Sequence, residues 1–223
     1  MAFRWSDLPF PWQAAVEQAW TAYRTGSVPV GAVVVDAEGV ILGRGRNGME
    51  EPPGESRLYR HHLAHAELNA LLAVARPASE LHACSLYSTL EPCPLCMGAV
   101  YMSGVRSLYY AASDPHAGSV NLLGATPYLS LKPVAAWGPG PRSLELFCGA
   151  IHTEYRLRRH AHNGADPVIA RWRPALPEIV ALGEGLYSHG FYPTAGKEGW
   201  DVQTAMAAVL EGCDLALNGR RVA

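Results

Sequence analysis

The sequence predicts an α/β fold, a three-layer α/β/α sandwich around a central mixed sheet, followed by a helical C-terminal extension. Segments with apolar residues at helical spacing follow segments with alternating apolar residues along the first part of the chain. Such an order buries a sheet between layers of helices. We expect a catalytic domain over 1–162 and an extension over 163–223 that packs on it.

The predicted elements of the first domain follow from periodicity and from turn residues. Leu68, Leu71 and Leu72 recur at helical intervals, and Pro94 suits the first position of a helix. In chain order we expect a helix over 12–23, a hairpin of strands 28–36 and 40–46, a helix over 63–75, a strand over 84–90, a helix over 96–102, strands over 107–111 and 144–147, and a helix over 150–159.

The extension begins with a predicted linker, residues 163–166. Helical patterns cover 167–187 and 201–218, where Asp201 suits an N-cap and Gly219 a C-terminal stop. The loop expected at 190–196 carries Phe191 and Tyr192, which form the tip of a lid in one hypothesis. Packing against the first domain is the simpler alternative.

Composition indicates a globular chain. Its 223 residues are 49% hydrophobic and 17% charged, with a mean hydropathy near zero, which is enough to bury a full core. The N-terminus lacks a charged region followed by an apolar one, and no apolar run approaches 18 residues. Five cysteines, two of them allotted below to a metal, fit a reducing compartment. We therefore expect a cytoplasmic protein with no membrane partner.

Two short motifs predict a catalytic metal site. His65-Ala66-Glu67 is followed 28 residues after its histidine by Pro92-Cys93-Pro94-Leu95-Cys96. His65, Cys93 and Cys96 supply three zinc ligands, so one Zn²⁺ per chain would keep its fourth position for a catalytic water. Glu67 is then free to act as the general acid and base.

Placement of these motifs at helix starts supports the prediction. His65 and Glu67 fall in the first turn of the predicted helix 63–75, and the two cysteines at the start of the next helix. Free backbone N–H groups at a helix N-terminus favour thiolate, the form that binds zinc.

Each motif alone has a simpler interpretation. A lone His-x-Glu is usually structural, and a lone Cys-x-x-Cys serves as half of a structural zinc knuckle or as a redox pair. A structural site would normally close with a fourth Cys or His, and Cys84, Cys148 and Cys213 form no second Cys-x-x-Cys. Together and in this order, the motifs match the zinc-deaminase signature.

The chain resembles the cytidine and deoxycytidylate deaminase superfamily, in the branch of tRNA adenosine, guanine and cytosine deaminases. The resemblance covers about residues 8–162, beyond which nothing is recognised. Besides the metal motifs, it includes Val28-Pro29-Val30-Gly31-Ala32-Val33-Val34-Val35, Gly43-Arg44-Gly45-Arg46-Asn47, Met97-Gly98-Ala99, Ala112-Ser113-Asp114-Pro115-His116-Ala117-Gly118 and Leu144-Glu145-Leu146-Phe147-Cys148-Gly149-Ala150.

The resemblance implies a cytidine deaminase-like fold and roles for individual residues. It makes His65, Cys93 and Cys96 the zinc ligands, Glu67 the proton shuttle and Asn47 a hydrogen-bonding partner of the substrate base. Asn47 is alternatively a turn residue, because Asn-Gly is a favoured turn pair. Further expected substrate contacts are Ala66, Glu91, Pro92, Asp114 and His116.

The substrate is predicted from charge. With 18 Lys and Arg against 20 Asp and Glu, the chain lacks the basic field typical of polynucleotide binders. We expect hydrolytic deamination of a free nucleobase or nucleoside. The alternatives are a tRNA-specific adenosine deaminase, for which the basic cluster Arg156, Arg158, Arg159 and His160 would contact RNA, and a catalytically silent zinc module for protein association. The resemblance also implies a homodimer or a larger homo-oligomer.

The loop between Asn47 and His65 is longer than we expect for this branch of the superfamily. It contains the adjacent pair His61 and His62, which could recognise a phosphate or a base but in an exposed loop are more often bystanders. Tyr59 stacks on substrate in one hypothesis and only packs the loop in the other.

Overall fold

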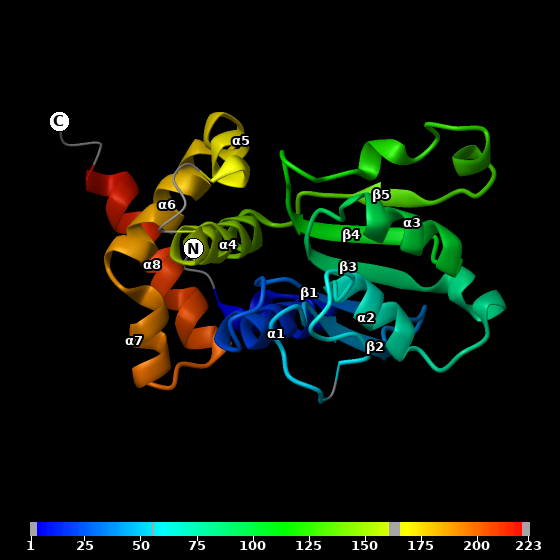
Figure 1. Cartoon of the computed structure of the whole chain (residues 1–223), viewed down its shortest axis with the longest axis horizontal. Helices are drawn as coiled ribbons and strands as arrows, with labels where there is room; N and C mark the ends of the chain where they lie inside the picture. Colours follow the sequence, from blue (N-terminus) through cyan, green and yellow to red (C-terminus); the bar gives the residue numbers. More distant parts are fainter. Residues whose placement is uncertain (1–3, 55, 161–165, 220–223) are drawn as a thin grey trace.

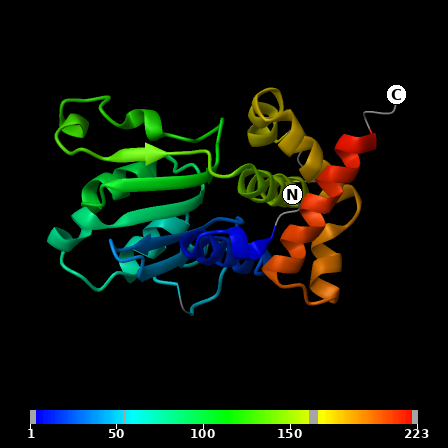
Figure 2. The ribbon, with the colours of Figure 1, turned by 180° about the vertical axis from the view of Figure 1, so that it is seen from behind.

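The computed structural model describes residues 4–54, 56–160 and 166–219 of the chain (Figure 1). A five-stranded sheet has the strand order β2-β1-β3-β4-β5, and helices cover both of its faces. The C-terminal helices gather at one end of the sheet, as seen from both sides of the molecule (Figures 1 and 2). The predicted α/β/α sandwich with a mixed sheet and a helical extension is confirmed.

The sheet combines antiparallel and parallel pairs. Strand β1 pairs antiparallel with β2 and with β3, whereas β3, β4 and β5 run parallel to one another. The parallel half places the C-terminal ends of β3 and β4 at one edge, next to the segments that begin at residues 91 and 113. The strands are β1 (Gly31–Val35), β2 (Ile41–Arg46), β3 (Ser85–Leu90), β4 (Ser107–Ala112) and β5 (Ala135–Trp137).

The two faces of β1 show how alternation builds the layers. Ala32 and Val34 pack in the cluster shared with α2 and α3, whereas Val33 and Val35 pack against α1 on the other face. The helices of the sandwich are α1 (Phe10–Arg24), α2 (Ala66–Ala73), α3 (Pro94–Ser103) and α4 (Arg142–His160). Short 3-10 turns lie at Trp5–Asp7, Ala78–Ala83, Val120–Leu122 and Tyr128–Ser130.

Helix α2, which carries half of the metal motif, lies directly on β2. A Cβ at Gly45 would stand 2.1 Å from the Ala70 nitrogen, and one at Gly43 would stand 2.3 Å from the Ala70 oxygen. Both positions therefore need glycine, because contacts this short do not occur for real side chains. The two glycines let the helix approach the sheet and so fix the position of its N-terminus.

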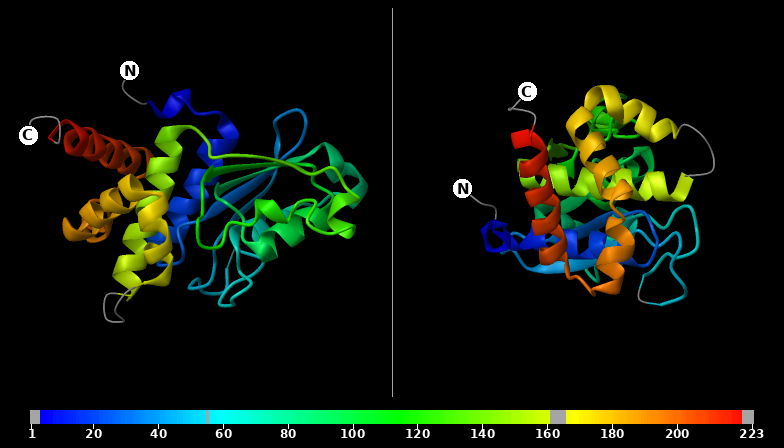
Figure 3. Two further views of the ribbon diagram at one scale, coloured as in Figure 1. Left: turned by 90° about the horizontal axis from the view of Figure 1, so that it is seen from above. Right: turned by 90° about the vertical axis from the view of Figure 1, so that its left-hand side faces the viewer.

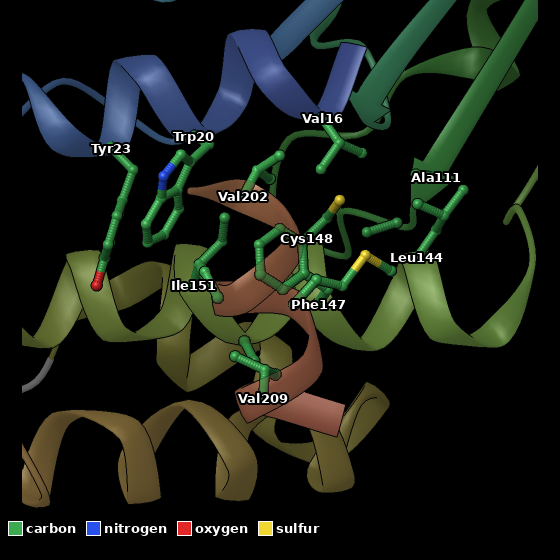
Figure 4. Close-up of a cluster of buried hydrophobic side chains, with 14 of the residues drawn as sticks. Val16, Trp20, Tyr23, Ala111, Leu144, Phe147, Cys148, Ile151, Val202 and Val209 are labelled. Atoms are coloured by element: carbon green, nitrogen blue, oxygen red, sulfur yellow. The ribbon is translucent and has the colours of Figure 1, made fainter. Parts of the chain in front are cut away.

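The extension consists of α5 (Pro167–Ala175), α6 (Pro177–Ser188), α7 (Phe191–Lys197) and α8 (Val202–Gly219). These helices lie beside α4, away from the far end of the sheet (Figure 3). Helix α4 contributes Phe147 and Ile151 to a buried cluster that also contains Trp20 of α1 and Val202 and Val209 of α8 (Figure 4). The extension thus shares a hydrophobic core with the sandwich.

One predicted strand is wrong. Residues 144–147 were expected to form the last core strand, but they belong to the first half of α4, which buries Leu144, Phe147 and Ile151 at helical spacing. Leu144, Leu146 and Phe147 with Glu145 between them form a short, mostly apolar segment, which fits a strand or a buried helix equally well. The fifth strand is β5, a three-residue segment without a strong strand pattern.

The expected loop at 190–196 is helix α7, and the lid hypothesis is not supported. Phe191 is 7% exposed and packs edge-on against Trp20, while Tyr192 packs against Tyr23. Both rings are anchored in the core instead of forming a tip.

The other boundaries of the extension differ in detail. The helix expected over 167–187 is broken at Leu176, because Pro177 disfavours helical geometry in the residue before it. Asp201 is the N-cap, since its Oδ1 accepts from the Thr204 nitrogen. Residues 163–165 of the predicted linker, and the domain boundary placed at 162, lie outside the described residues. Among the described helices, none is long and apolar enough to cross a membrane.

Candidate active site

Two helix N-termini bring the metal motif together. His65 is the N-cap of α2 and Cys93 the N-cap of α3, so His65 stands just before the helix and not within its first turn as predicted. Cys96 follows in the first turn of α3. The His65 Nδ1 atom lies 3.5 Å from Cys93 Sγ and 3.3 Å from Cys96 Sγ, and the two sulfurs are 3.7 Å apart.

These distances fit a tetrahedral zinc ion. Zinc with bonds of about 2.3 Å to sulfur and about 2.0–2.1 Å to nitrogen places two sulfurs about 3.8 Å apart and sulfur and nitrogen about 3.6 Å apart. The observed separations agree to within a few tenths of an ångström. Among the described residues, His65, Cys93 and Cys96 form the one group of three that could hold a metal ion. An imidazole and two thiolates are the ligand types that zinc prefers, so Zn²⁺ is the cofactor that this site fits.

The protonation of the cysteines suits metal binding. The hydrogen-bond contact with Cys96 lowers the pKa of Cys93 to about 4, which favours the thiolate form. The same hydrogen bond and burial raise the pKa of Cys96. Both sulfurs must be thiolates to act as ligands, so metal binding displaces any proton that remains on them.

Glu67 stands beside the metal ligands without belonging to them. Its side chain is 4% exposed, and Oε1 accepts a hydrogen bond of 3.1 Å from Ser88 Oγ. Oε2 lies 3.3 Å from Cys96 Sγ. Burial raises the pKa of the Glu67 carboxyl above its ordinary value, which makes the group better able to take up and hold a proton.

A cavity of about 240 Å³ opens onto these groups. That volume is below the range of roughly 300–1,000 Å³ of pockets for drug-sized ligands, so it suits a single heterocycle. Of the residues predicted from sequence, the cavity is lined by Asn47, His65, Ala66, Glu67, Glu91, Cys93, Asp114 and His116. Cys96 lies behind them, fully buried, and Pro92 is buried next to the cavity without lining it.

Asn47 combines the two roles that the sequence left open. It follows β2 at the cavity wall and is 4% exposed. Its Oδ1 accepts from the Met49 nitrogen at 3.2 Å, which is the hydrogen bond of a local Asx turn. The turn therefore fixes the direction of the amide and leaves its nitrogen as the group with which a ligand can be bound.

Glu91 and Asp114 hold the rim of the cavity. Glu91 Oε2 accepts from the Asp114 nitrogen at 3.1 Å, and Asp114 Oδ1 accepts from the backbone nitrogens of His116 and Ala117 at 2.9 and 3.1 Å. A third donor, Trp172 Nε1, lies 2.8 Å from the same Asp114 oxygen. Both carboxylates therefore hold neighbouring groups in place at the rim of the cavity.

The loop between Asn47 and His65 is held by two buried polar residues. Asn69 of α2 bonds the backbone of Leu58 through both ends of its amide and also donates to the Arg46 oxygen. Glu51, 3% exposed, forms an ion pair with Arg46. His61, His62 and Tyr59 are exposed and lie outside the cavity lining, which agrees with their simpler interpretation. Met49 is the loop residue that reaches the cavity.

Sequence reasoning missed one wall of the cavity. His152 and Arg156 of α4 and Val168 of α5 line it together with Val28, Val30, Leu90 and Ala117. His152 is 7% exposed and its ring stacks on Trp172, with centroids 4.8 Å apart. No local motif marks these residues, since α4 and α5 reach the cavity only through the folded arrangement. A histidine and an arginine four residues apart on one helix are the single signal available.

Comparisons with known proteins agree with this site. Residues 10–112 match the family described as the cytidine and deoxycytidylate deaminase zinc-binding region. A tRNA-specific adenosine deaminase from Rickettsia bellii is 38% identical over 109 residues, which are 48% of this chain and 70% of that relative. The chain therefore belongs to the cytidine and deoxycytidylate deaminase family.

Two further comparisons show how varied the similar proteins are. A tRNA(Ile)-lysidine synthase from Deinococcus radiodurans is 40% identical over 108 residues, 48% of this chain but 17% of that relative, so the chain spans less than a fifth of its length. The structure of a guanine deaminase from Nitrosomonas europaea matches with a TM-score of 0.50 at 26% identity, over 66% of this chain and 85% of the other.

Proposed function

We propose that this protein is a zinc-dependent hydrolytic deaminase that replaces the exocyclic amine of a free nucleobase or nucleoside with a carbonyl and releases ammonia. The observation that carries the proposal is the position of Glu67, whose buried carboxylate lies 3.3 Å from a metal-ligand sulfur and lines the same small cavity. A structural zinc site has no use for that carboxylate, which argues against the silent module.

The metal ligands and Glu67 have different roles in the proposed reaction. Zn²⁺, when held by His65, Cys93 and Cys96, supplies a Lewis acid that activates water. Glu67 Oε1 accepts from Ser88 and Oε2 faces the Cys96 sulfur, so Oε2 is the oxygen nearer the metal ligands and the one that takes a first proton from the attacking water. It passes this proton to the ring nitrogen, then takes the second water proton from the new hydroxyl on the ring carbon and passes it to the departing amine. Water adds, ammonia leaves, and the protons balance without any further reactant.

The basic cluster favours a small substrate over RNA. Arg156 forms an ion pair with Asp166 at 2.6 Å, Arg158 with Glu154 at 3.2 Å and Arg159 with Glu50 at 2.6 Å. Guanidinium groups already paired with carboxylates add little positive field toward phosphates. These arginines were the main sequence evidence for RNA binding, and in the structure they form ion pairs within the protein.

The tRNA-specific alternative rests on the relatives. The Rickettsia bellii relative is named as a tRNA-specific adenosine deaminase, and an enzyme that flips a single base out of RNA also uses a small pocket. Cavity size therefore does not separate the two substrates. The predicted homo-oligomer and the cytoplasmic location stay predictions.

Ammonia release tests the proposal. Zinc-loaded protein is offered cytosine, guanine, adenine, their nucleosides and nucleotides, and unmodified tRNA, with Glu67→Ala as the inactive control that keeps its zinc. We expect turnover of one base or nucleoside that barely responds to salt. Release from tRNA alone, falling steeply as salt rises, would establish the alternative. Near-normal activity of Glu67→Ala would contradict the role of this carboxylate.

A further inference from the structure

His152 is a buried polar side chain that no described residue satisfies. It lines the active-site cavity from α4, is 7% exposed, and its Nδ1 atom has no hydrogen-bond partner. Buried polar atoms are almost always hydrogen-bonded, because an unpaired one loses its contact with water without compensation. The imidazole lines the cavity and keeps hydrogen-bonding capacity that no described residue uses, so it is a candidate for contact with a ligand.

The extension holds the His152 ring in place. Trp172 of α5 is 1% exposed and stacks on the imidazole at 4.8 Å with an interplanar angle of 18°. Trp172 is itself fixed, because its Nε1 donates a hydrogen bond of 2.8 Å to Oδ1 of Asp114 at the rim of the cavity. The imidazole thus has a defined plane and cannot turn without breaking a stack and disturbing a buried hydrogen bond.

The charge around this wall selects against anionic groups. Three carboxylates, from Glu67, Glu91 and Asp114, line the cavity. Its one guanidinium, from Arg156, is paired with Asp166 at 2.6 Å. Away from the metal ligands, the lining carries more negative than positive charge, so it would repel a phosphate. An uncharged ring would not be repelled. The wall therefore suits a neutral heterocycle.

We infer that His152 is a substrate-recognition residue whose imidazole hydrogen-bonds a polar group on the edge of a neutral nucleobase, with Trp172 as its positioning residue. The inference rests on the proposed function and deepens it, since it assigns the α4 and α5 wall to selection of the base. The metal ligands and Glu67 then act on the amine, while His152 contacts another part of the same ring.

The protonation state of His152 is consistent with this role. Burial lowers the pKa of His152 to about 4, so the ring is neutral at physiological pH. A neutral imidazole offers one donor and one acceptor, which matches the mixed edges of nucleobases. A charged ring would offer two donors and would be less selective.

His152→Phe tests the inference because it keeps an aromatic ring on Trp172 and removes both ring nitrogens. We expect kcat/KM for the preferred base to fall about tenfold to a hundredfold, as for a lost hydrogen bond that leaves its partner unsatisfied. The decisive readout uses analogues of that base in which each hydrogen-bonding group of the edge is removed in turn, such as deaza compounds. For one analogue the difference between wild type and His152→Phe should vanish, since the contact is then absent from both.

Two further variants separate recognition from structure. His152→Gln keeps a donor and an acceptor and should retain more activity than His152→Phe, with melting temperature and zinc content measured for both. Ile151→Val is the matched control, because Ile151 is the adjacent buried residue of α4, packs in the hydrophobic cluster (Figure 4) and does not line the cavity. It should lower stability without changing the ranking of the analogues. Trp172→Phe should repeat the analogue pattern of His152→Phe with a smaller factor.

The outcomes distinguish this inference from the proposed function. Equal loss for the parent base and every analogue in His152→Phe would mean a purely structural histidine and would overturn the inference. If no base releases ammonia, the proposed function fails. Calorimetric titration of cytosine, guanine and adenine into Glu67→Gln and into Glu67→Gln/His152→Phe then decides the inference alone. Tighter binding by the first protein supports it, and equal or absent binding refutes it.

Discussion

The active-site cavity has two walls that are built in different ways. The metal wall carries His65, Glu67 and Cys93 on two helix N-termini that lie against the sheet. The second wall carries His152 and Val168 on α4 and α5, and its geometry depends on contacts with the extension. The family match ends at residue 112, so it contains the whole metal wall but neither His152 nor Val168 of the second.

This difference teaches that chemistry and selection can be encoded separately. Groups that activate water and move protons are fixed by short motifs, because their spacing must satisfy one metal ion. Groups that recognise the rest of a substrate need only reach the cavity, and any element that packs nearby can supply them. Similar proteins with different named substrates fit this arrangement.

The largest expected effect concerns the metal wall. Cys96→Ser removes a buried member of the metal group, whereas Cys84→Ser changes a buried cysteine that lies outside that group. We expect Cys96→Ser to lose zinc affinity by more than about 100-fold, beyond the cost of losing an outer-shell partner, and to lose turnover of every substrate. Zinc content and ammonia release measure this. Equal zinc loss in both variants would show that general destabilisation, and not ligation, is responsible.

A smaller effect is expected where the second wall meets the extension. A Cβ at Gly183 of α6 would lie 2.4 Å from Thr153 Cβ, next to His152, whereas a Cβ at Gly185 on the same helix meets nothing within 4 Å. Gly183→Ala should destabilise the fold by about 1–3 kcal/mol and raise KM with zinc content unchanged. Gly185→Ala should stabilise by about 0.5–1 kcal/mol through helix propensity. Thermal unfolding and kinetics check both, and an unchanged KM in Gly183→Ala would separate the extension from the wall.

The smallest effect is a pH dependence of stability that belongs to the second wall alone. Burial lowers the pKa of His152 to about 4 from an ordinary value near 6.5, so the unfolded chain binds this proton more readily than the folded one. Stability from this group is full above about pH 6.5 and is lost as the pH falls toward 4. Relative to His152→Phe, wild type should lose about 1–2 kcal/mol between pH 6.5 and pH 5. If the difference in unfolding free energy between the two proteins were the same at pH 6.5 and at pH 5, this prediction would be wrong.

Much of the fold was predictable where local patterns are strong. The β1 and β2 hairpin was predicted from strand patterns on either side of the turn at 37–39, β3 from its alternating residues, and α1 from its helical period. Residues 144–147 were misassigned because four residues, three of them apolar, are too few to distinguish a strand period from a helical one. The 190–196 segment was taken for a loop because Gly190, Pro193 and Gly196 break a helical pattern, yet packing of Phe191 and Tyr192 on α1 stabilises a helix there.

The sequence alone predicted the metal group and Glu67, because His-x-Glu followed by Pro-Cys-x-x-Cys is a recognisable pair of motifs, and Pro94 marks the start of α3 without knowledge of the fold. Only the tertiary structure decided which elements close the cavity. The hydrogen bond between Trp172 and Asp114 joins residues 58 apart in the chain, and the stack that orients His152 depends on it. No local propensity encodes such a contact, since its free energy arises only when the extension packs on α4 and buries both rings.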